Sequence, residues 1–126
     1  MEAGIGMAAG RSSLTDVKEI VRLSNLYDFY GPLLKDRHRE IFEAYVLDDL
    51  SLGEIASQYG MTRQGVYDIV KRCSRHLEEY EEKLSLFDRF QKAKERLGQV
   101  ERLVRNEGVP GSDSILDLTH EIYEML

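Results

Sequence analysis

Residues 52–72, LGEIASQYGMTRQGVYDIVKR, constrain the fold of this chain more than any other segment. Ser51 lies three residues before Glu54, which is the spacing of a capping box at the start of a helix. Gly60 then supplies the left-handed backbone that a sharp turn between two helices requires. Thr62 can cap the helix that follows. The segment therefore predicts a helix-turn-helix, in which the second helix crosses the first and keeps its outer face free.

The rest of the chain also favours helices over strands. It has only two prolines and no tryptophan, and no apolar alternation of strand length occurs in it. We therefore predict an all-α fold, a helix-turn-helix with a long C-terminal helical extension. Its expected parts are a disordered, glycine-rich arm over 1–14, the helix-turn-helix domain over 15–87, and the extension over 88–126.

Capping and breaking signals place two further helices before the central segment. The first is expected to begin near Thr15 or Asp16 and to end at Gly31-Pro32, because proline blocks a helical backbone bond. The second is expected to be capped by Asp36 and closed by Asp48-Asp49.

A long apolar stripe continues out of the second helix of the central segment. Its spacing alternates between four and three over three heptads, the lower limit for a coiled coil. The stripe resumes in a shifted phase at Phe90, and with Gly98 it predicts a bend or a break there. Because the first helix and this long helix carry more apolar surface than one small core can cover, we predict a homodimer. The stripe consists of Val66, Val70, Cys73, Leu77, Tyr80, Leu84 and Phe87.

The charge of the chain argues against indiscriminate coating of nucleic acid, since its formal net charge is −6. The acidity is uneven: residues 1–75 hold 10 Lys and Arg against 11 Asp and Glu, whereas 76–126 hold 7 against 12. The single cysteine, Cys73, fits a reducing cytoplasm, and no signal peptide or membrane-spanning run is expected. Within the acidic half, residues 78–83 are expected to be a solvated helix face.

The outer face of the second helix is the strongest candidate for a functional site. Arg63 can pair with guanine edges and Gln64 with adenine, while Thr62 at the helix start suits a phosphate. Cations further along the helix can hold the backbone of DNA or RNA. An alternative is a helix-turn-helix that packs helices and binds only protein. The predicted contacts are Thr62, Arg63, Gln64, Tyr67, Lys71, Arg72 and Arg75.

Two other features carry weaker signals. The stretch 89–105 holds six Arg and Lys against two Glu, and it is either a phosphate clamp or, as we favour, a solvated amphipathic helix. His38, His76 and His120 lie far apart without metal-ligand spacing, and Cys73 fits a core position. We therefore predict no catalytic residue, no metal site and no cofactor.

Residues 20–97 resemble the YlxM-like family of small bacterial helix-turn-helix proteins. Their central unit is similar to region 4 of bacterial sigma factors, in which promoter-reading positions match Arg63, Gln64 and Tyr67. Those factors usually carry further basic residues at the sites of Gly65 and Tyr67. The residues that carry the family resemblance are Leu26-Tyr27-Asp28-Phe29-Tyr30, Leu33-Leu34, the run from Asp48 to Ala56, the run from Gly60 to Asp68, and the run from Leu77 to Leu84.

The resemblance implies a role that the residues alone do not. Genes of this family lie beside those of the signal recognition particle GTPases, which implies a regulatory part in that pathway. Components of the particle are therefore expected partners, either through nucleic acid or, alternatively, through an adaptor contact with the GTPase.

Overall fold

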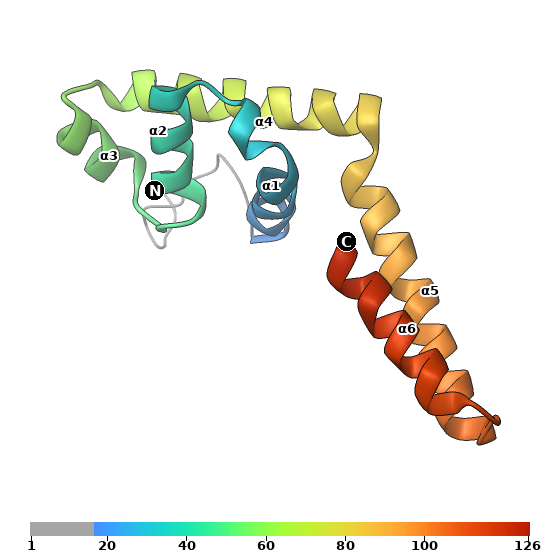
Figure 1. Ribbon diagram of the computed structural model, residues 1–126. Coiled ribbons are helices and arrows are strands. Elements are labelled where there is room, and N and C mark those ends of the chain that lie inside the picture. The colour runs from blue at the N-terminus through green and yellow to red at the C-terminus, as the bar shows by residue number, and fades with distance from the viewer. Residues whose placement is uncertain (1–16) are drawn as a thin grey trace. The chain divides into compact units, whose positions relative to one another are not determined.

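The computed structural model describes residues 17–126, and every regular element in that part of the chain is a helix (Figure 1). The prediction of an all-α fold is confirmed. The arm expected over 1–14 and the cap expected at Thr15 or Asp16 lie outside the described residues. The elements are α1 (Val17–Tyr30), the 3-10 turn η1 (Gly31–Leu33), α2 (Asp36–Val46), α3 (Leu52–Tyr59), α4 (Arg63–Leu84), α5 (Leu86–Glu107) and α6 (Ser112–Met125).

The chain divides into two compact units, the first ending at Leu84 and the second being Ser85–Leu126. Between them Ser85 has a φ of 54°, a left-handed conformation that ends α4. The bend or break predicted from the phase shift at Phe90 and from Gly98 occurs at Ser85, close to the phase shift, whereas Gly98 itself lies inside α5. A serine in this conformation carries no sequence signal, since non-glycine residues rarely adopt it. The domain boundary predicted after residue 87 stays a prediction.

In the first unit α1, α2 and α3 pack along the long helix α4 (Figure 1). Val66, Val70, Cys73 and Leu77 of α4 are buried beneath them. The apolar stripe is therefore core from Val66 to Leu77, whereas Leu84 of the stripe and Val17 and Val21 of α1 are exposed. The homodimer predicted from the apolar surface of these two helices stays a prediction. Other fully buried side chains of this core are Leu23, Leu26, Tyr30, Ile41, Phe42, Tyr45 and Ile55.

Polar contacts tie α1 to the C-terminal half of α4. The buried hydroxyl of Tyr30 donates a hydrogen bond of 2.6 Å to Oε1 of Glu81. Near it, Arg22 forms a two-pronged ion pair with Glu78, with both nitrogen–oxygen distances at 2.7 Å. The expectation of a solvated face over 78–83 is wrong at Glu81, whose side chain is buried.

The predicted capping box at the start of α3 is confirmed. The backbone N–H of Glu54 donates to Oγ of Ser51 at 3.1 Å, and the backbone N–H of Ser51 donates to Oε1 of Glu54 at 2.9 Å. These bonds lower the pKa of the Glu54 carboxyl. By contrast α2 begins at Asp36, and its cap position is Lys35, so the cap predicted at Asp36 is wrong by one residue.

The turn between α3 and α4 also has the predicted geometry. Gly60 adopts φ 64° and ψ 40°, the left-handed conformation that allows the chain to reverse in few residues. Oγ1 of Thr62 then accepts a hydrogen bond of 2.9 Å from the backbone N–H of Gly65. These local bonds fix where α4 starts, and they leave Arg63 and Gln64 in its first turn exposed.

The second unit is a hairpin of α5 and α6. Gly108 and Gly111 in its turn have φ values of 61° and 78°. Among its residues only Val104 and Thr119 are buried.

Candidate nucleic-acid interface

All seven predicted contact residues belong to α4 or to the residue that caps it. Six of these side chains are exposed, and Tyr67 is half-buried. The exposed six are Thr62, Arg63, Gln64, Lys71, Arg72 and Arg75.

Two of the exposed side chains nearest the start of α4 bond to each other. The side-chain amide of Gln64 donates a hydrogen bond of 2.9 Å to Oδ1 of Asp68, one helical turn later. This bond holds the Gln64 amide beside Asp68, and the Asp68 carboxylate adds a negative charge to the same face. The start of α4 therefore favours contact through Arg63 and the backbone over base reading through Gln64.

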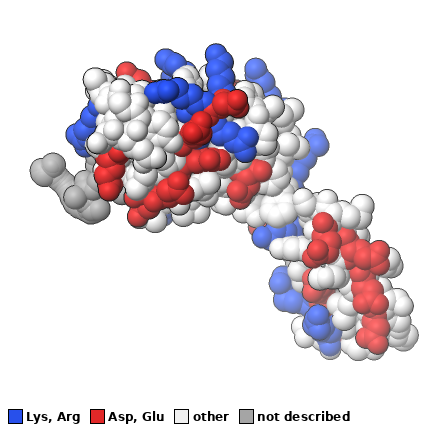
Figure 2. All heavy atoms as spheres, turned by 60° about the vertical axis from the view of Figure 1, so that its left-hand side comes forward, with Lys and Arg blue, Asp and Glu red and all other residues white. Residues whose placement is uncertain are grey.

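The charge on the outside of α4 changes sign along the helix. Lys71, Arg72 and Arg75 are exposed in its middle, whereas Glu78, Glu79 and Glu82 follow them. Figure 2 shows Lys and Arg gathered along one edge of this unit, with Asp and Glu over the neighbouring surface. Phosphates are therefore attracted to the stretch from Lys71 to Arg75 and repelled from the stretch from Glu78 to Glu82.

The start of α2 adds cations that sequence reasoning did not place at this site. The backbone carbonyl of His38 lies 3.8 Å from Sγ of Cys73, so this end of α2 sits beside the middle of α4. Burial, followed by the charges of Arg72 and Lys35, lowers the pKa of His38. The guanidinium of Arg37 also reaches the carbonyl of Tyr59 at the end of α3, at 3.4 Å.

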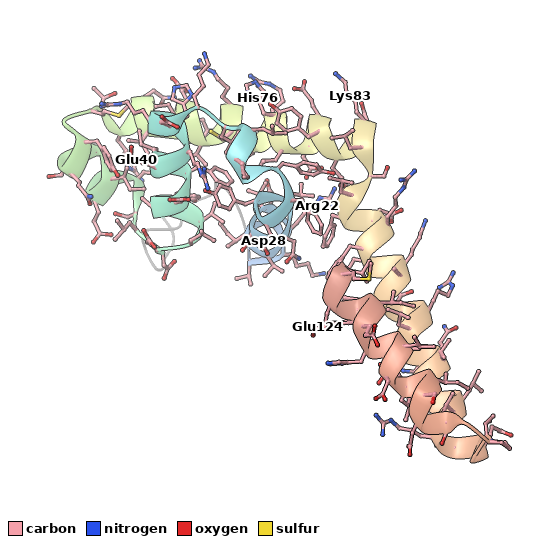
Figure 3. The ribbon with its side chains drawn as sticks, viewed as in Figure 1. Arg22, Asp28, Glu40, His76, Lys83 and Glu124 are labelled. Atoms are coloured by element: carbon pink, nitrogen blue, oxygen red, sulfur yellow. The ribbon has the colours of Figure 1, made fainter. Side chains whose placement is uncertain are left out.

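Five exposed cations from two helices thus share one surface, which we call the basic ridge. On α4, His76 points away from α1, as Figure 3 shows. The run from Lys35 to Arg39 is basic in sequence, but only the packing of α2 on α4 brings it to the ridge. The basic ridge consists of Lys35, Arg37, Lys71, Arg72 and Arg75.

Cys73 lies directly beneath the ridge and is a core residue, as predicted, with its side chain 1% exposed. Between residues 17 and 126 there is no group of three or more His, Cys, Asp or Glu side chains that could hold a metal ion. No helix in the same range combines the length and the apolar composition needed to cross a membrane.

The buried thiol makes stability depend on pH. Burial raises the pKa of Cys73 to about 11, above its ordinary value of 9.0. Above pH 9 the unfolded chain loses this proton while the folded chain keeps it, so the free energy of unfolding falls as pH rises. The loss approaches about 1.4 kcal/mol per pH unit between pH 9 and 11. Urea denaturation measures the free energy of unfolding of the wild type and of Cys73→Ala. The difference between the two values should be constant from pH 7 to 8 and should shrink from pH 9 to 10.5. A constant difference over the whole range would contradict the shift.

Residues 17–109, well over half of the chain, match the model of one family, UPF0122, described as "Putative helix-turn-helix protein, YlxM / p13 like". The chain belongs to the UPF0122 family. This confirms the resemblance that the sequence showed to YlxM-like proteins. The matched residues include the whole helix-turn-helix and the basic ridge, whereas α6 lies outside them.

Individual members of UPF0122 are similar over most of their length. The protein of Geobacillus sp. (strain WCH70) is 44% identical over 110 residues, which cover 86% of this chain and 98% of the relative. That of Bacillus licheniformis is 40% identical over 106 residues, covering 84% and 97%. That of Halalkalibacterium halodurans is 49% identical over 84 residues, covering 67% and 77%. By its description, the family is one of helix-turn-helix proteins.

Proposed function

We propose that this chain is a regulatory protein without catalytic activity, which binds DNA or RNA through its helix-turn-helix and takes part in the signal recognition particle pathway. The observation that carries the nucleic-acid part is the basic ridge, whose five cations from α2 and α4 flank the exposed start of α4. The pathway part rests on the resemblance to YlxM-like proteins. We expect the protein to work in the cytoplasm, as a homodimer, beside the GTPases of that pathway.

The chemistry of the site favours contact with the nucleic-acid backbone. Lys71, Arg72 and Arg75 suit phosphates, while Arg63 at the start of α4 is the residue best placed for a base edge. Gly65 and Tyr67 stand where sigma factors usually carry basic side chains, and Gln64 is bonded to Asp68. We therefore expect binding that depends strongly on salt and only weakly on sequence.

An alternative function is an adaptor that docks helices onto the GTPase without touching nucleic acid. The acidic second half of α4, with Glu78, Glu79 and Glu82 exposed, favours this reading. Such a surface repels phosphates and attracts a basic protein surface.

A salt series separates the two functions. Binding of the full chain to duplex DNA and to the particle's RNA should be measured by fluorescence anisotropy between 50 and 300 mM salt. The basic ridge predicts that log K falls with log salt with a slope of roughly −3 to −5, because each phosphate contact releases about one counterion. Binding to both probes that is absent, or that does not change with salt, would overturn the nucleic-acid function and support the adaptor.

A further inference from the structure

The α5–α6 hairpin has almost no core of its own. It spans two helices from Leu86 to Met125, yet only Val104 and Thr119 are buried. Two helices bury one stripe each against one another, and a second stripe on each stays open unless something covers it. Exposed apolar side chains that form a continuous patch mark an interaction surface.

On α6 the open stripe is well defined. Leu118, Ile122 and Met125 follow one another at spacings of four and three, and their exposed fractions are 59%, 47% and 84%. A different stripe of the same helix, with Thr119 buried and Leu116 half-buried, contacts α5. Two apolar stripes on one helix are typical of a helix in a four-helix bundle.

On α5 a matching open stripe is present. Val100 and Leu103 are exposed by 37% and 61%. The residues that face α6 alternate with them, since Val104 is buried and Leu97 is half-buried. The heptad spacing that begins at Phe90 therefore places apolar side chains on two faces of α5, one that contacts α6 and one that is exposed.

The two open stripes lie on the same side of the hairpin. At about 100° per residue, each lies roughly a quarter turn from the stripe that contacts the neighbouring helix, and in the same rotational sense. Because α5 and α6 run antiparallel, an offset in the same rotational sense places both open stripes on one side of the hairpin. We call this the open side, and it consists of Val100, Leu103, Leu118, Ile122 and Met125.

The charges of the hairpin are divided between its two helices. Helix α6 holds four Asp and Glu and no Lys or Arg, whereas α5 holds six Lys and Arg against four Asp and Glu. Figure 2 shows the acidic residues along one flank of this unit and the basic residues along the other. Around the open side, Lys92 and Arg96 of α5 and Asp117 and Glu121 of α6 are exposed.

We propose that the open side docks onto the open side of a second copy of this chain, forming a four-helix bundle in which each α5 lies against the partner's α6. A twofold axis parallel to the helices places the basic flank of each copy on the acidic flank of the other. The other twofold arrangement, α5 on α5 and α6 on α6, opposes like charges. Charge thus selects the arrangement, and apolar burial supplies the affinity.

This inference rests on the proposed homodimer and names its surface. The first test is sedimentation equilibrium of the full chain at micromolar concentration, in which the wild type should have the mass of a dimer. Leu118→Glu with Ile122→Glu should weaken the dimer at least 100-fold, because it puts charges into an apolar contact. Both side chains are substantially exposed, so the hairpin itself should keep its helical circular dichroism. The matched control is Val21→Glu, an exposed valine on α1 that should leave the dimer unchanged.

Charge reversal tests the arrangement. Lys92→Glu with Arg96→Glu should weaken the dimer roughly tenfold, and so should Asp117→Lys with Glu121→Lys. All four changes in one chain should restore it, because each reversed α5 then meets a reversed α6. With α5 on α5 the combined variant would show no such rescue.

The possible outcomes distinguish a wrong docking surface from a wrong homodimer. A wild-type monomer, in which the hairpin is covered by its own chain or by another protein, would refute both. A wild-type dimer that withstands the α6 substitutions, or that is lost in Val21→Glu, would refute the open side and leave the homodimer standing.

Discussion

Replacing Lys71, Arg72 and Arg75 by glutamine is expected to lower the affinity for DNA or RNA on the order of 100-fold near physiological salt. The reason is that these three exposed cations form the part of the basic ridge that lies on α4. Each lost phosphate contact should also make the slope of log K against log salt shallower by about one. Fluorescence anisotropy with the probes of the salt series measures both quantities, and urea denaturation should show stability within about 0.5 kcal/mol of the wild type.

The matched control removes the same charge elsewhere. Lys18, Lys83 and Arg102 are exposed and lie outside the basic ridge, so replacing them by glutamine should change affinity only through net charge. If both triple variants lose affinity equally, the attraction is a property of the whole chain and the ridge is not the site. Separately, Lys35→Gln with Arg37→Gln should weaken binding if α2 contributes as its position beside Arg72 implies.

Truncating Glu81 to alanine is expected to cost about 2–4 kcal/mol of the free energy of unfolding. The substitution removes the acceptor of the hydrogen bond from the buried Tyr30 hydroxyl, which measures 2.6 Å, and empties the space of the side chain. Urea denaturation followed by far-ultraviolet circular dichroism measures the loss, and Tyr30→Phe is expected to cost about 1–2 kcal/mol. The double variant should cost less than the sum of the two, because both remove the same bond.

Neighbouring residues supply the control for Glu81. Glu82 is exposed on the next position of α4, and its replacement by alanine should change stability by less than about 0.5 kcal/mol. Glu81→Gln keeps an acceptor and the shape of the side chain. Its loss in the free energy of unfolding should therefore lie between the losses of Glu81→Ala and Glu82→Ala. An equal effect of the alanine substitutions at 81 and 82 would mean that the Tyr30 bond adds nothing to stability.

Signals that act within a few residues proved readable in the sequence. The capping box of Ser51 and Glu54 and the left-handed Gly60 are where the pattern predicts them, because each depends on bonds that the segment makes with itself. The buried positions of α4 were equally readable, since helical spacing alone determines which side chains share a face. These local rules gave the fold class and the helix-turn-helix.

Features that depend on distant parts of the chain could not be read in this way. Periodicity shows that the stripe of α4 is apolar, but only the packing of α1, α2 and α3 shows that it is covered from Val66 to Leu77 while Leu84 stays exposed. The same packing buries Glu81 in a run that looks solvated, and it brings Lys35 and Arg37 beside Arg72. The phase shift at Phe90 indicates a helix break nearby, but it does not place the break at Ser85, since serine is not a residue that favours a left-handed backbone.

The sequence by itself determined the secondary structure around the turn, the family and the seven candidate contacts, because capping, spacing and side-chain charge are properties of short segments. The tertiary structure decided which apolar stripes are covered, which carboxylate is buried and which cations share a surface. Those outcomes depend on which helices meet, and helices that meet across more than thirty residues of sequence leave no local mark of the contact. The open side of the α5–α6 hairpin belongs to this second group, since the packing of α5 against α6 decides which of their apolar side chains stay exposed.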